Sequence, residues 1–358
     1  MKILQVIPHF GIGGAEAMCK HLSIALKKAG CDVKVVSLFD IRTQNTEELE
    51  REGVEISYLN KKQGLDISVL RKLKKEISTF SPDIIHSHLS ALKYAFFASS
   101  KYETPIIYTV HSVAKYDSGK ISQALNSLFL KSGRVRFVAL SREIQKTIID
   151  TYKLTPNDVP VVLNGVPVGS YERKKKYSLS ESTSIVNVAS FQPVKNQIEL
   201  LKAILLLRAK NIDCKLSLYG DGVNRHLIEE FIIQNDMGDF VCLHGFKGNV
   251  PELLPNYDIF VLPSLLEGIP LSIIEAMATA MPIVASGVGG ILDMIEDEKN
   301  GLLCEPNADS IAQKLEQAIS SQVLRESIGN TAFVDVERFS SKSMCNGYIS
   351  VYNALCAK

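Results

Sequence analysis

Two glutamates, Glu267 and Glu275, lie in a segment whose pattern predicts a strand, a loop and a helix. The apolar run 258–262 is typical of a buried parallel strand. The apolar period over 271–279 is typical of a helix, with Pro270 where a first helical residue tolerates proline. Glu267 is therefore expected in the loop, and Glu275 about one turn inside the helix. Because the backbone amides of a helix start bind anions, the segment suits a ligand with both hydroxyls and phosphates, such as a nucleotide sugar.

Two further side chains, Lys195 and His111, are expected just after predicted strands. A lysine at the start of a helix in that position can neutralise the charge of a bound diphosphate. The alternative is a solvated surface lysine. His111 ends a buried strand at its carboxyl edge, where open sheets bind ligands, and the alternative is a histidine of the core.

The sequence predicts no metal site. No Asp-x-Asp pair occurs, so the charge of a leaving diphosphate must be met by Lys195, a helix N-terminus and backbone amides. His86 and His88 alternate onto one strand face, but no third ligand follows at a suitable spacing, and a structural role is favoured. Seven cysteines without a Cys-x-x-Cys pair favour a reducing cytoplasm and argue against structural zinc.

Glycine turns follow several of the predicted strands. The turn Gly11-Ile12-Gly13-Gly14 opens the first helix, as a phosphate-binding turn does, and Asp40 lies near the place of a dehydrogenase's ribose-binding acid. Glu16, however, stands where a dinucleotide fingerprint needs a small residue, which argues against a dehydrogenase. The turns at Gly220 and at Gly245-Phe246 are consistent with ligand approach or with simple turns.

Strand patterns alternate with helix patterns in two series, which predicts an α/β protein with two doubly wound domains facing each other across a cleft. In the first half we expect strands at 3–7, 33–38, 84–85, 106–110 and 137–140, and helices at 15–28 and 65–80. In the second half we expect strands at 184–188, 215–219, 240–243, 258–262 and 283–285, and a helix at 196–210. The segment 167–184 has no apolar period and is predicted to be the linker.

The composition is that of a globular protein long enough for two domains, with 358 residues, 46% hydrophobic and 22% charged. No apolar run is long enough to cross a bilayer, and we see no signal-peptide pattern. Residues 1–170 carry 23 Lys and Arg against 16 Asp and Glu, whereas residues 171–358 carry 17 against 23. The first half therefore favours an anionic partner or surface, although surface solvation alone can produce such a division.

Several short motifs, spread over nearly the whole chain, resemble those of one family. They are Gly11-Ile12-Gly13-Gly14-Ala15-Glu16, Asn164-Gly165-Val166, the two glutamates followed by Ala276-Met277-Ala278, the stretch 282–290, and Asn300-Gly301-Leu302-Leu303. In combination they resemble the signature of retaining glycosyltransferases of the GT-B fold, in particular glycosyltransferase family 4 (glycosyl transferases group 1). The resemblance implies an acceptor-binding Rossmann-like domain at 1–168, with the last helix, 341–358, packing back on it. It implies a donor-binding Rossmann-like domain at 169–340.

The resemblance also implies residue roles. Three residues would be catalytic: His111, which would reach the donor sugar, Lys195, which would contact the diphosphate, and Glu267, which would contact the transferred sugar. Glu275 would hold the ribose hydroxyls. The donor-binding residues would be Gly13, Gly14, Ser190, Lys195, Gly220, Phe246, Glu267, Gly268, Ile269, Pro270, Leu271 and Glu275. Ser190 departs from the pattern, because the family usually has an arginine near this position, so one cationic contact to the leaving group is missing.

The resemblance thus implies a cytoplasmic, metal-independent, retaining enzyme without a cofactor. It would transfer a hexose or N-acetylhexosamine from a nucleotide sugar, most simply a UDP-sugar, to a glycan or a polyprenyl-diphosphate-linked acceptor in bacterial surface polysaccharide synthesis. Nucleic acid is not an expected partner. Two alternatives remain, a non-catalytic nucleotide-sugar-binding protein and a sugar-nucleotide epimerase on a similar fold.

The basic first half also allows a peripheral contact with the inner face of a membrane. The helix 65–80 has apolar positions on one face (Ile67, Leu70, Leu73, Ile77) and basic residues elsewhere (Arg71, Lys72, Lys74, Lys75). The segment 115–136 adds a similar mixture (Leu125, Leu128, Phe129 and Leu130 near Lys120, Lys131, Arg134 and Arg136). Each Lys or Arg near an anionic membrane contributes about 1 kcal/mol of binding. The alternative is that both apolar faces pack on the sheet of their own domain.

Overall fold

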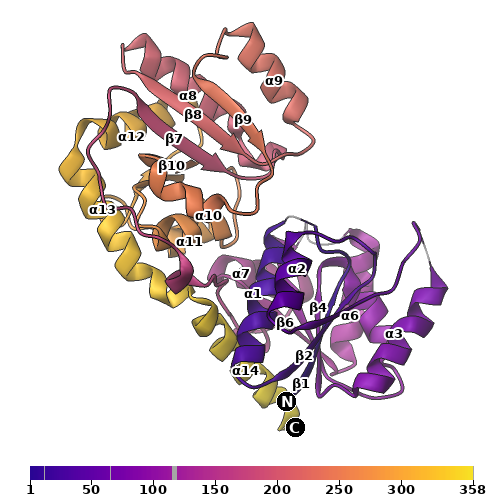
Figure 1. The fold of residues 1–358 in the computed structure, drawn as a ribbon. Helices are drawn as coiled ribbons and strands as arrows, with labels where there is room; N and C mark the ends of the chain where they lie inside the picture. The colour runs from indigo at the N-terminus through magenta and orange to yellow at the C-terminus, as the bar shows by residue number, and fades with distance from the viewer. Residues whose placement is uncertain (12, 65, 115–118, 358) are drawn as a thin grey trace. The chain divides into compact units, whose positions relative to one another are not determined.

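The computed structural model describes residues 1–357 except 12, 65 and 115–118, and it divides into two compact units (Figure 1). Unit 1 is Met1–Gly165 with Ser341–Lys358, and unit 2 is Val166–Ser340. Each unit contains one six-stranded sheet whose strand order reverses direction in the middle. The prediction of an α/β protein with two doubly wound sheets is confirmed.

The sheet of unit 1 is parallel throughout and has the strand order β3-β2-β1-β4-β5-β6. Its strands are β1 (Lys2–Ile7), β2 (Asp32–Ser37), β3 (Glu55–Tyr58), β4 (Ile84–His88), β5 (Ile106–Val110) and β6 (Val135–Ala139). The central strands are apolar runs because helices cover both faces of a parallel sheet. The order reverses between β1 and β4, and ligands of such sheets bind at the carboxyl ends of the strands near this point.

Two helices of unit 1, α3 (Ile67–Phe80) and α7 (Arg142–Tyr152), begin where a local side chain accepts a hydrogen bond from one of their first amides. Asp66 accepts a hydrogen bond from the amide of Ser68, and Ser141 accepts one from the amide of Ile144. The described helices are α1 (Gly14–Lys28), α2 (Gln44–Arg51), α3 (Ile67–Phe80), α4 (Leu92–Ala98), α6 (Lys120–Lys131), α7 (Arg142–Tyr152) and α14 (Ser341–Cys356), with 3₁₀ turns at Leu89–Ala91 and Pro156–Asp158. Helix α14 packs against α1 and completes the core of unit 1.

The sheet of unit 2 has the parallel order β12-β11-β10-β7-β8-β9. Its strands are β7 (Thr183–Val188), β8 (Cys214–Tyr219), β9 (Val241–Gly245), β10 (Ile259–Leu262), β11 (Ile283–Ser286) and β12 (Leu302–Cys304). Its helices are α8 (Gln197–Ala209), α9 (Arg225–Gln234), α10 (Val250–Leu253), α11 (Leu271–Ala278), α12 (Ala308–Ser320) and α13 (Gln322–Asp335). Short 3₁₀ turns lie at Val168–Ser170, Pro193–Lys195, Leu254–Asn256, Gly289–Asp293 and Val336–Phe339.

Each predicted strand overlaps an observed one, whereas β3 and β12 have no predicted counterpart. The predicted helix 196–210 is α8, with Asn196 and Lys210 as its flanking residues. The predicted helix 65–80 is α3, which begins at Ile67, and Leu65 lies outside the described residues. None of the helices in the described parts of the chain is long and apolar enough to cross a membrane.

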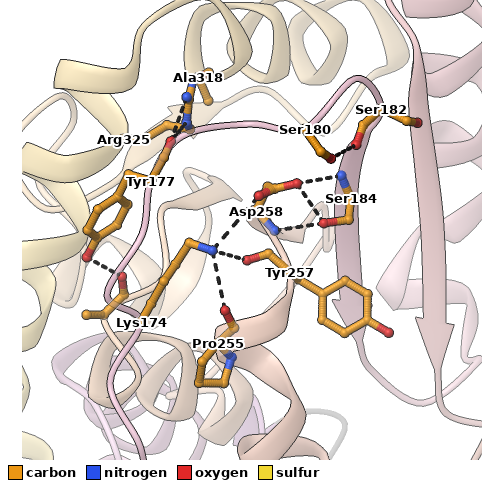
Figure 2. A network of polar contacts seen from close by, with 11 residues as sticks. Lys174, Tyr177, Ser180, Ser182, Ser184, Pro255, Tyr257, Asp258, Ala318 and Arg325 are labelled. Carbon is orange, nitrogen blue, oxygen red and sulfur yellow. Dashed lines mark hydrogen bonds and ion pairs between the residues drawn. The ribbon is translucent and has the colours of Figure 1, made fainter.

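The segment 167–184, predicted to be a linker, is instead fixed to the body of unit 2 (Figure 2). The side chain of Lys174 is buried, and its ammonium donates to the carbonyl of Tyr257 at 2.5 Å and lies 3.9 Å from the carboxylate of Asp258. The guanidinium of Arg325 donates to the carbonyl of Tyr177 at 2.7 Å. Because these partners lie far along the chain, no local pattern in the segment indicates them.

Candidate active site

Glu267 and Glu275 lie in the strand, loop and helix of unit 2 that the sequence predicts. β10 ends at Leu262 and α11 begins at Leu271, which leaves Glu267 in the loop and Glu275 on the helix. Pro270 precedes the first helical residue, one position before its predicted place, with φ −69° and ψ 123°. Since the first amides of a helix have no partner one turn before them, the start of α11 offers N–H groups to an anion.

Lys195 and Glu267 are 72 residues apart in the sequence and form an ion pair, with Nζ 2.6 Å from Oε1. Ser264 donates its hydroxyl to the same carboxylate oxygen at 2.7 Å. The side chain of Glu267 is 7% exposed and that of Lys195 is 21% exposed. The carboxylate is thus held from two sides, while the ammonium keeps access to the surface. Two of the three residues predicted to be catalytic are in direct contact.

The loop that carries Glu267 is fixed by backbone contacts to its neighbours. The amide of Gly290 donates to the carbonyl of Glu267 at 3.1 Å, and the amide of Leu265 donates to the carbonyl of Val194 at 2.8 Å. A Cβ atom at Gly290 would collide with the carbonyl of Gly268. The loops after β7, β10 and β11 therefore meet through their main chains, and a side chain at Gly290 is incompatible with this arrangement.

Gly220 lies against the loop that contains Ser190. Its φ of +140° is in the region that favours glycine, and a Cβ atom there would collide with the carbonyl of Ala189. The amide of Gly220 donates to the carbonyl of Gly245 at 2.9 Å. Ser190 is half-buried, and its carbonyl accepts from the side-chain amide of Gln197 at 3.0 Å. Glycine at position 220 thus lets the chain after β8 approach two other loops.

The remaining predicted donor-binding residues of unit 2 divide into buried and accessible ones. The side chains of Ile269, Pro270 and Leu271 are buried. Only the backbone of this stretch can therefore contact a ligand. Gly268 and Glu275 are half-buried. Phe246, just after β9, has an exposed fraction of 46%, and an exposed aromatic ring at a sheet edge can stack on a planar base.

The glycine turn of unit 1 is occupied by a carboxylate. Gly13 precedes α1, whose first residue is Gly14, and a Cβ atom at Gly13 would collide with the carboxylate of Glu16. The carboxylate of Glu16 is buried and lies 3.2 Å from Nδ1 of His9, and burial raises the pKa of Glu16. The carboxylate of Glu16 thus lies against the glycine turn, where a pyrophosphate would meet an acidic group, and this supports the argument against a dehydrogenase. Ile12, within the same turn, lies outside the described residues.

His111 follows β5 in unit 1 and contacts His88, with the Nε2 of His111 3.2 Å from the Nδ1 of His88. Burial lowers the pKa of His111 to about 4, so that its ring is neutral at pH 7. Both ring nitrogens of His86 are 2.7 Å from hydroxyls, those of Tyr352 and Thr109. These contacts agree with a structural role for His86. Within the described ranges, no group of three His, Cys, Asp or Glu side chains is arranged to hold a metal ion.

A hollow of about 320 Å³ lies at the carboxyl edge of the unit 1 sheet, and the sequence did not predict it. It is lined by Pro8, Leu38, Phe39, Lys61, Gly64, Ser90, Lys93 and Tyr94. The ammonium of Lys61 lies 4.8 Å from the ring centre of Phe39 and 5.7 Å from the ring centre of Tyr94. The ammonium of Lys93 lies 5.4 Å from the ring centre of Tyr94. The ammonium of Lys61 donates to the carbonyls of Lys62 and Gly64 at 2.8 and 2.6 Å. In the described part of the chain no carboxylate pairs with Lys61 or Lys93, so that two positive charges lie near the ring of Tyr94.

The two segments predicted to contact a membrane have different surroundings. In α3 the apolar residues Leu73 and Ile77 are buried, as the packing alternative predicts, while Ile67 is 69% exposed. In α6 the exposed fractions are 82% for Ile121 and 61% for Leu128, which lie two turns apart.

Two of the residues proposed for membrane contact in the segment 115–136 face inward. Phe129 is buried, and Arg134 donates to the carbonyl of Thr104 and to the carbonyl and hydroxyl of Ser99. Lys115 lies outside the described residues. Arg134 therefore fastens the start of β6 to the chain after α4 and is not available to a membrane.

Sequence reasoning missed two residues that shape the Lys195 and Glu267 pair. Ser264 stands three residues before Glu267 in the same loop, and a hydroxyl this near a glutamate in the sequence is the one sign that could have revealed it. Asn196 has a φ of +60°, and its side-chain amide donates to the carbonyls of Pro263 and Pro306 at 3.1 and 3.0 Å. No local pattern marks these two partners, which lie 67 and 110 residues away.

Comparisons with known proteins agree with this architecture. Residues 170–334 match the family model of glycosyl transferases group 1, and residues 12–169 match that of glycosyltransferase family 4. N-acetyl-alpha-D-glucosaminyl L-malate synthase of Bacillus anthracis is 27% identical over 303 residues, which are 80% of this chain and 78% of that protein. UDP-Gal:alpha-D-GlcNAc-diphosphoundecaprenol alpha-1,3-galactosyltransferase of Escherichia coli is 28% identical over 278 residues, 72% of this chain and 70% of that protein.

Solved structures share the fold over the full length. Alr3699/HepE of Anabaena in complex with UDP-glucose has a TM-score of 0.85 at 19% identity and covers 99% of this chain and 100% of its own. A glycosyltransferase of Rickettsia africae has a TM-score of 0.84 at 21% identity, with 99% and 98% covered. From the two family matches and this shared architecture, the chain belongs to the glycosyltransferases of family 4 (glycosyl transferases group 1) and has their GT-B fold.

Proposed function

We propose that this glycosyltransferase moves a hexose or N-acetylhexosamine from a UDP-sugar to a glycan or a polyprenyl-diphosphate-linked acceptor, with retention at the anomeric carbon and without a metal ion. The observation that carries the proposal is the cluster of Lys195, Glu267 and Ser264 in the loops beside the start of α11. The E. coli relative is named for a UDP-galactose donor and a diphosphoundecaprenol acceptor. A Staphylococcus aureus relative is named a poly(ribitol-phosphate) alpha-N-acetylglucosaminyltransferase.

The ion pair suggests how the donor is held. Lys195 and Glu267 pair with each other, and each charge holds the other in place. A bound UDP-sugar gives each of them a new partner, because phosphate oxygens attract the ammonium and sugar hydroxyls donate to the carboxylate. As the bond to the diphosphate breaks, Lys195 and the first amides of α11 stabilise the growing negative charge. Glu275 accepts hydrogen bonds from the ribose hydroxyls, and His111 contacts the transferred sugar.

The hollow of unit 1 is proposed to hold the charged part of the acceptor. Two ammonium groups without a carboxylate partner in the described residues suit a diphosphate, and the apolar and aromatic walls suit the atoms on either side of it. Ligand pockets have volumes of about 300–1,000 Å³. At about 320 Å³ the hollow fits a diphosphate with its first sugar and leaves a long prenyl chain outside.

A peripheral membrane contact would bring such a lipid-linked acceptor within reach. The exposed side chains Ile121 and Leu128 of α6 and Phe97 of α4 support this proposal, with the exposed Arg71 and Lys75 of α3 as basic residues for an anionic surface. Sedimentation with vesicles tests it: we expect salt-sensitive binding to phosphatidylglycerol vesicles and none to phosphatidylcholine vesicles. Failure to bind either kind, with full activity on a water-soluble acceptor, would exclude the membrane contact.

The function itself is tested by a screen of UDP-glucose, UDP-galactose, UDP-N-acetylglucosamine and GDP-mannose for thermal stabilisation, followed by NMR analysis of the product. We expect one UDP-sugar to raise the melting temperature and to give an axial product from an axial donor. An equatorial product would overturn retention. Conversion of the UDP-sugar to its epimer without any acceptor would establish an epimerase instead, and stabilisation without turnover on any acceptor would indicate a binding protein.

A further inference from the structure

A row of polar side chains crosses the buried sheet of unit 1 and ends at His111. Oε1 of Gln5, on β1, lies 2.7 Å from Nε2 of His88, on β4. Nδ1 of His88 lies 3.2 Å from Nε2 of His111, which follows β5. Gln5 and His88 are both fully buried. The three side chains form one chain of hydrogen bonds over three neighbouring strands.

Gln5 is an unfavourable residue for this position if packing alone is considered. Its neighbours on the same face of β1, Ile3 and Ile7, are fully buried apolar residues. Its amide nitrogen Nε2 is buried and has no hydrogen-bond partner among the described residues. An unsatisfied buried donor costs about 1–3 kcal/mol, and an apolar side chain of similar shape would avoid this cost. What the amide contributes is therefore its one hydrogen bond, to His88.

That hydrogen bond decides where the protons of two histidines lie. A neutral histidine carries one N–H, and the other ring nitrogen accepts. Burial lowers the pKa of both His88 and His111, so that both rings are neutral at pH 7. The carbonyl oxygen of Gln5 can only accept, which places the hydrogen of His88 on Nε2 and leaves its Nδ1 as an acceptor. His111 must then donate from Nε2, and its own Nδ1 is left as an acceptor.

A second set of contacts holds the ring of His88 in place. His86 stacks on His88, with ring centres 4.3 Å apart and planes inclined by 28°. The ring of His86 is itself held by the hydroxyls of Thr109 and Tyr352, each at 2.7 Å. His88 is thus fixed by stacking as well as by its two hydrogen bonds, and it cannot rotate without breaking them.

We propose that Gln5 is a positioning residue, which acts through His88 to keep His111 in the tautomer whose Nδ1 accepts a hydrogen bond from a hydroxyl of the transferred sugar. The inference rests on the proposed function, in which His111 contacts that sugar. Gln5 and His88 do not touch the substrate themselves. Replacement of Gln5 by an apolar residue leaves His88 free to carry its hydrogen on either nitrogen, and His111 then populates both tautomers.

The test uses the whole chain with ¹⁵N-labelled histidine, because two-bond ¹H–¹⁵N spectra distinguish the two neutral tautomers. In the wild type we expect His88 and His111 to carry hydrogen on Nε2, with signals assigned by His88→Asn and His111→Asn. In Gln5→Leu we expect the His111 signal to show both tautomers. We also expect kcat to fall about tenfold while the affinity for UDP and the melting temperature are unchanged or higher. Gln5→Met should behave in the same way.

Ser87→Ala is the matched control, since Ser87 is the neighbouring residue on β4 and its hydroxyl is likewise buried without a partner among the described residues. We expect it to change neither the His111 signal nor kcat. A wild-type spectrum with the hydrogen of His88 or His111 on Nδ1 would overturn the proposal without any variant. So would Gln5→Leu with an unchanged His111 tautomer or an unchanged kcat. The spectra do not depend on turnover, so that a wild type without transferase activity would refute the proposed function and leave the tautomer assignment to be judged separately.

Discussion

Two glycines of unit 2, Gly220 and Gly290, lie against main chain, whereas two glycines of the first turn of unit 1, Gly11 and Gly13, lie against side chains. Gly220 and Gly290 leave no room for a Cβ atom because carbonyls of other loops lie against them. In unit 1, Gly13 is limited by the carboxylate of Glu16, and Gly11 by the ring of His9. At these positions unit 2 is limited by the path of its backbone, and unit 1 by its side chains.

This difference bears on how each unit recognises a ligand. A site made by main chain keeps its shape whatever side chains surround it, and it suits a ligand that many enzymes share, such as a nucleoside diphosphate. A site made by side chains, like the hollow with Lys61 and Lys93, changes its chemistry with each substitution. Loops on a rigid scaffold are the usual place for such variation. The comparison therefore predicts that substitutions at these glycines and lysines change ligand binding and stability to different degrees in the two units.

The largest effect is expected for Lys195→Ala. Without the ammonium, the developing charge on the diphosphate loses a contact of the kind whose removal lowers kcat about 100- to 1,000-fold. Steady-state kinetics with the donor identified in the screen would measure it. The control is Lys202→Ala, which removes another ion pair of unit 2, to Glu199 at 2.8 Å, from the surface of α8. Equal losses in the two variants would show that Lys195 has no special role.

Gly290→Ala is expected to weaken donor binding at least tenfold and to destabilise the protein by about 1–3 kcal/mol, because the new Cβ atom forces the backbone at Gly268 to move. Calorimetry of UDP binding and thermal unfolding would measure both effects. Gly238→Ala is the control, since the space around Gly238 is open.

Gly13→Ala sharpens the comparison, because its Cβ atom meets the carboxylate end of Glu16 and not a carbonyl of the main chain. A side-chain end can shift, so that we expect a smaller loss of stability than for Gly290→Ala. If the two variants are equally damaged, the contrast between main-chain and side-chain edges is wrong.

Lys93→Ala and Lys61→Ala are expected to raise the KM for a polyprenyl-diphosphate acceptor about tenfold each, since a hydrogen bond to a charged group contributes about 1.5–3 kcal/mol. The affinity for UDP should not change. Lys101→Ala, at an exposed lysine of the same unit, serves as the control. A rise in donor KM with an unchanged acceptor KM would place the donor, and not the acceptor, at this hollow.

No effect is expected from a chelator. In the proposed mechanism the charge of the diphosphate is met by Lys195 and by the backbone amides at the start of α11. Transfer assays with and without EDTA should give the same rate. Loss of activity with EDTA and its recovery with magnesium or manganese would contradict the metal-independent mechanism.

The parts of the fold that the sequence predicts are those decided by local pattern. β5 was predicted at its observed bounds, because five apolar or β-branched residues form a short run that helices cover on both faces. Strands β3 and β12 were missed because β3 has no buried residue and β12 has only three residues, which leaves too short an apolar run to recognise. Strands β6 and β9 also lie at the ends of their sheets and were predicted.

The parts that the sequence does not predict depend on partners far along the chain. Lys174 looks like one of a run of basic linker residues, and only the carbonyl of Tyr257, 83 residues away, shows why it is buried. The same holds for the site: spacing placed Glu267 in a loop, but its contact with Lys195 spans 72 residues. Contacts between residues far apart in the chain produce no periodic pattern of apolar residues in the sequence.

The burial of Tyr348 and Tyr352 has a consequence for biosynthesis. Tyr352 bonds His86 across 266 residues, and Tyr348 bonds Thr109 across 239 residues. Unit 1 therefore has a high contact order and cannot complete its core until α14 has left the ribosome. At about 5–20 residues per second, translation of residues 166–340 takes roughly 10–35 s, and over this time the first 165 residues of unit 1 wait for their last helix. Unit 1, whose translation begins first, is thus the unit whose core is completed last.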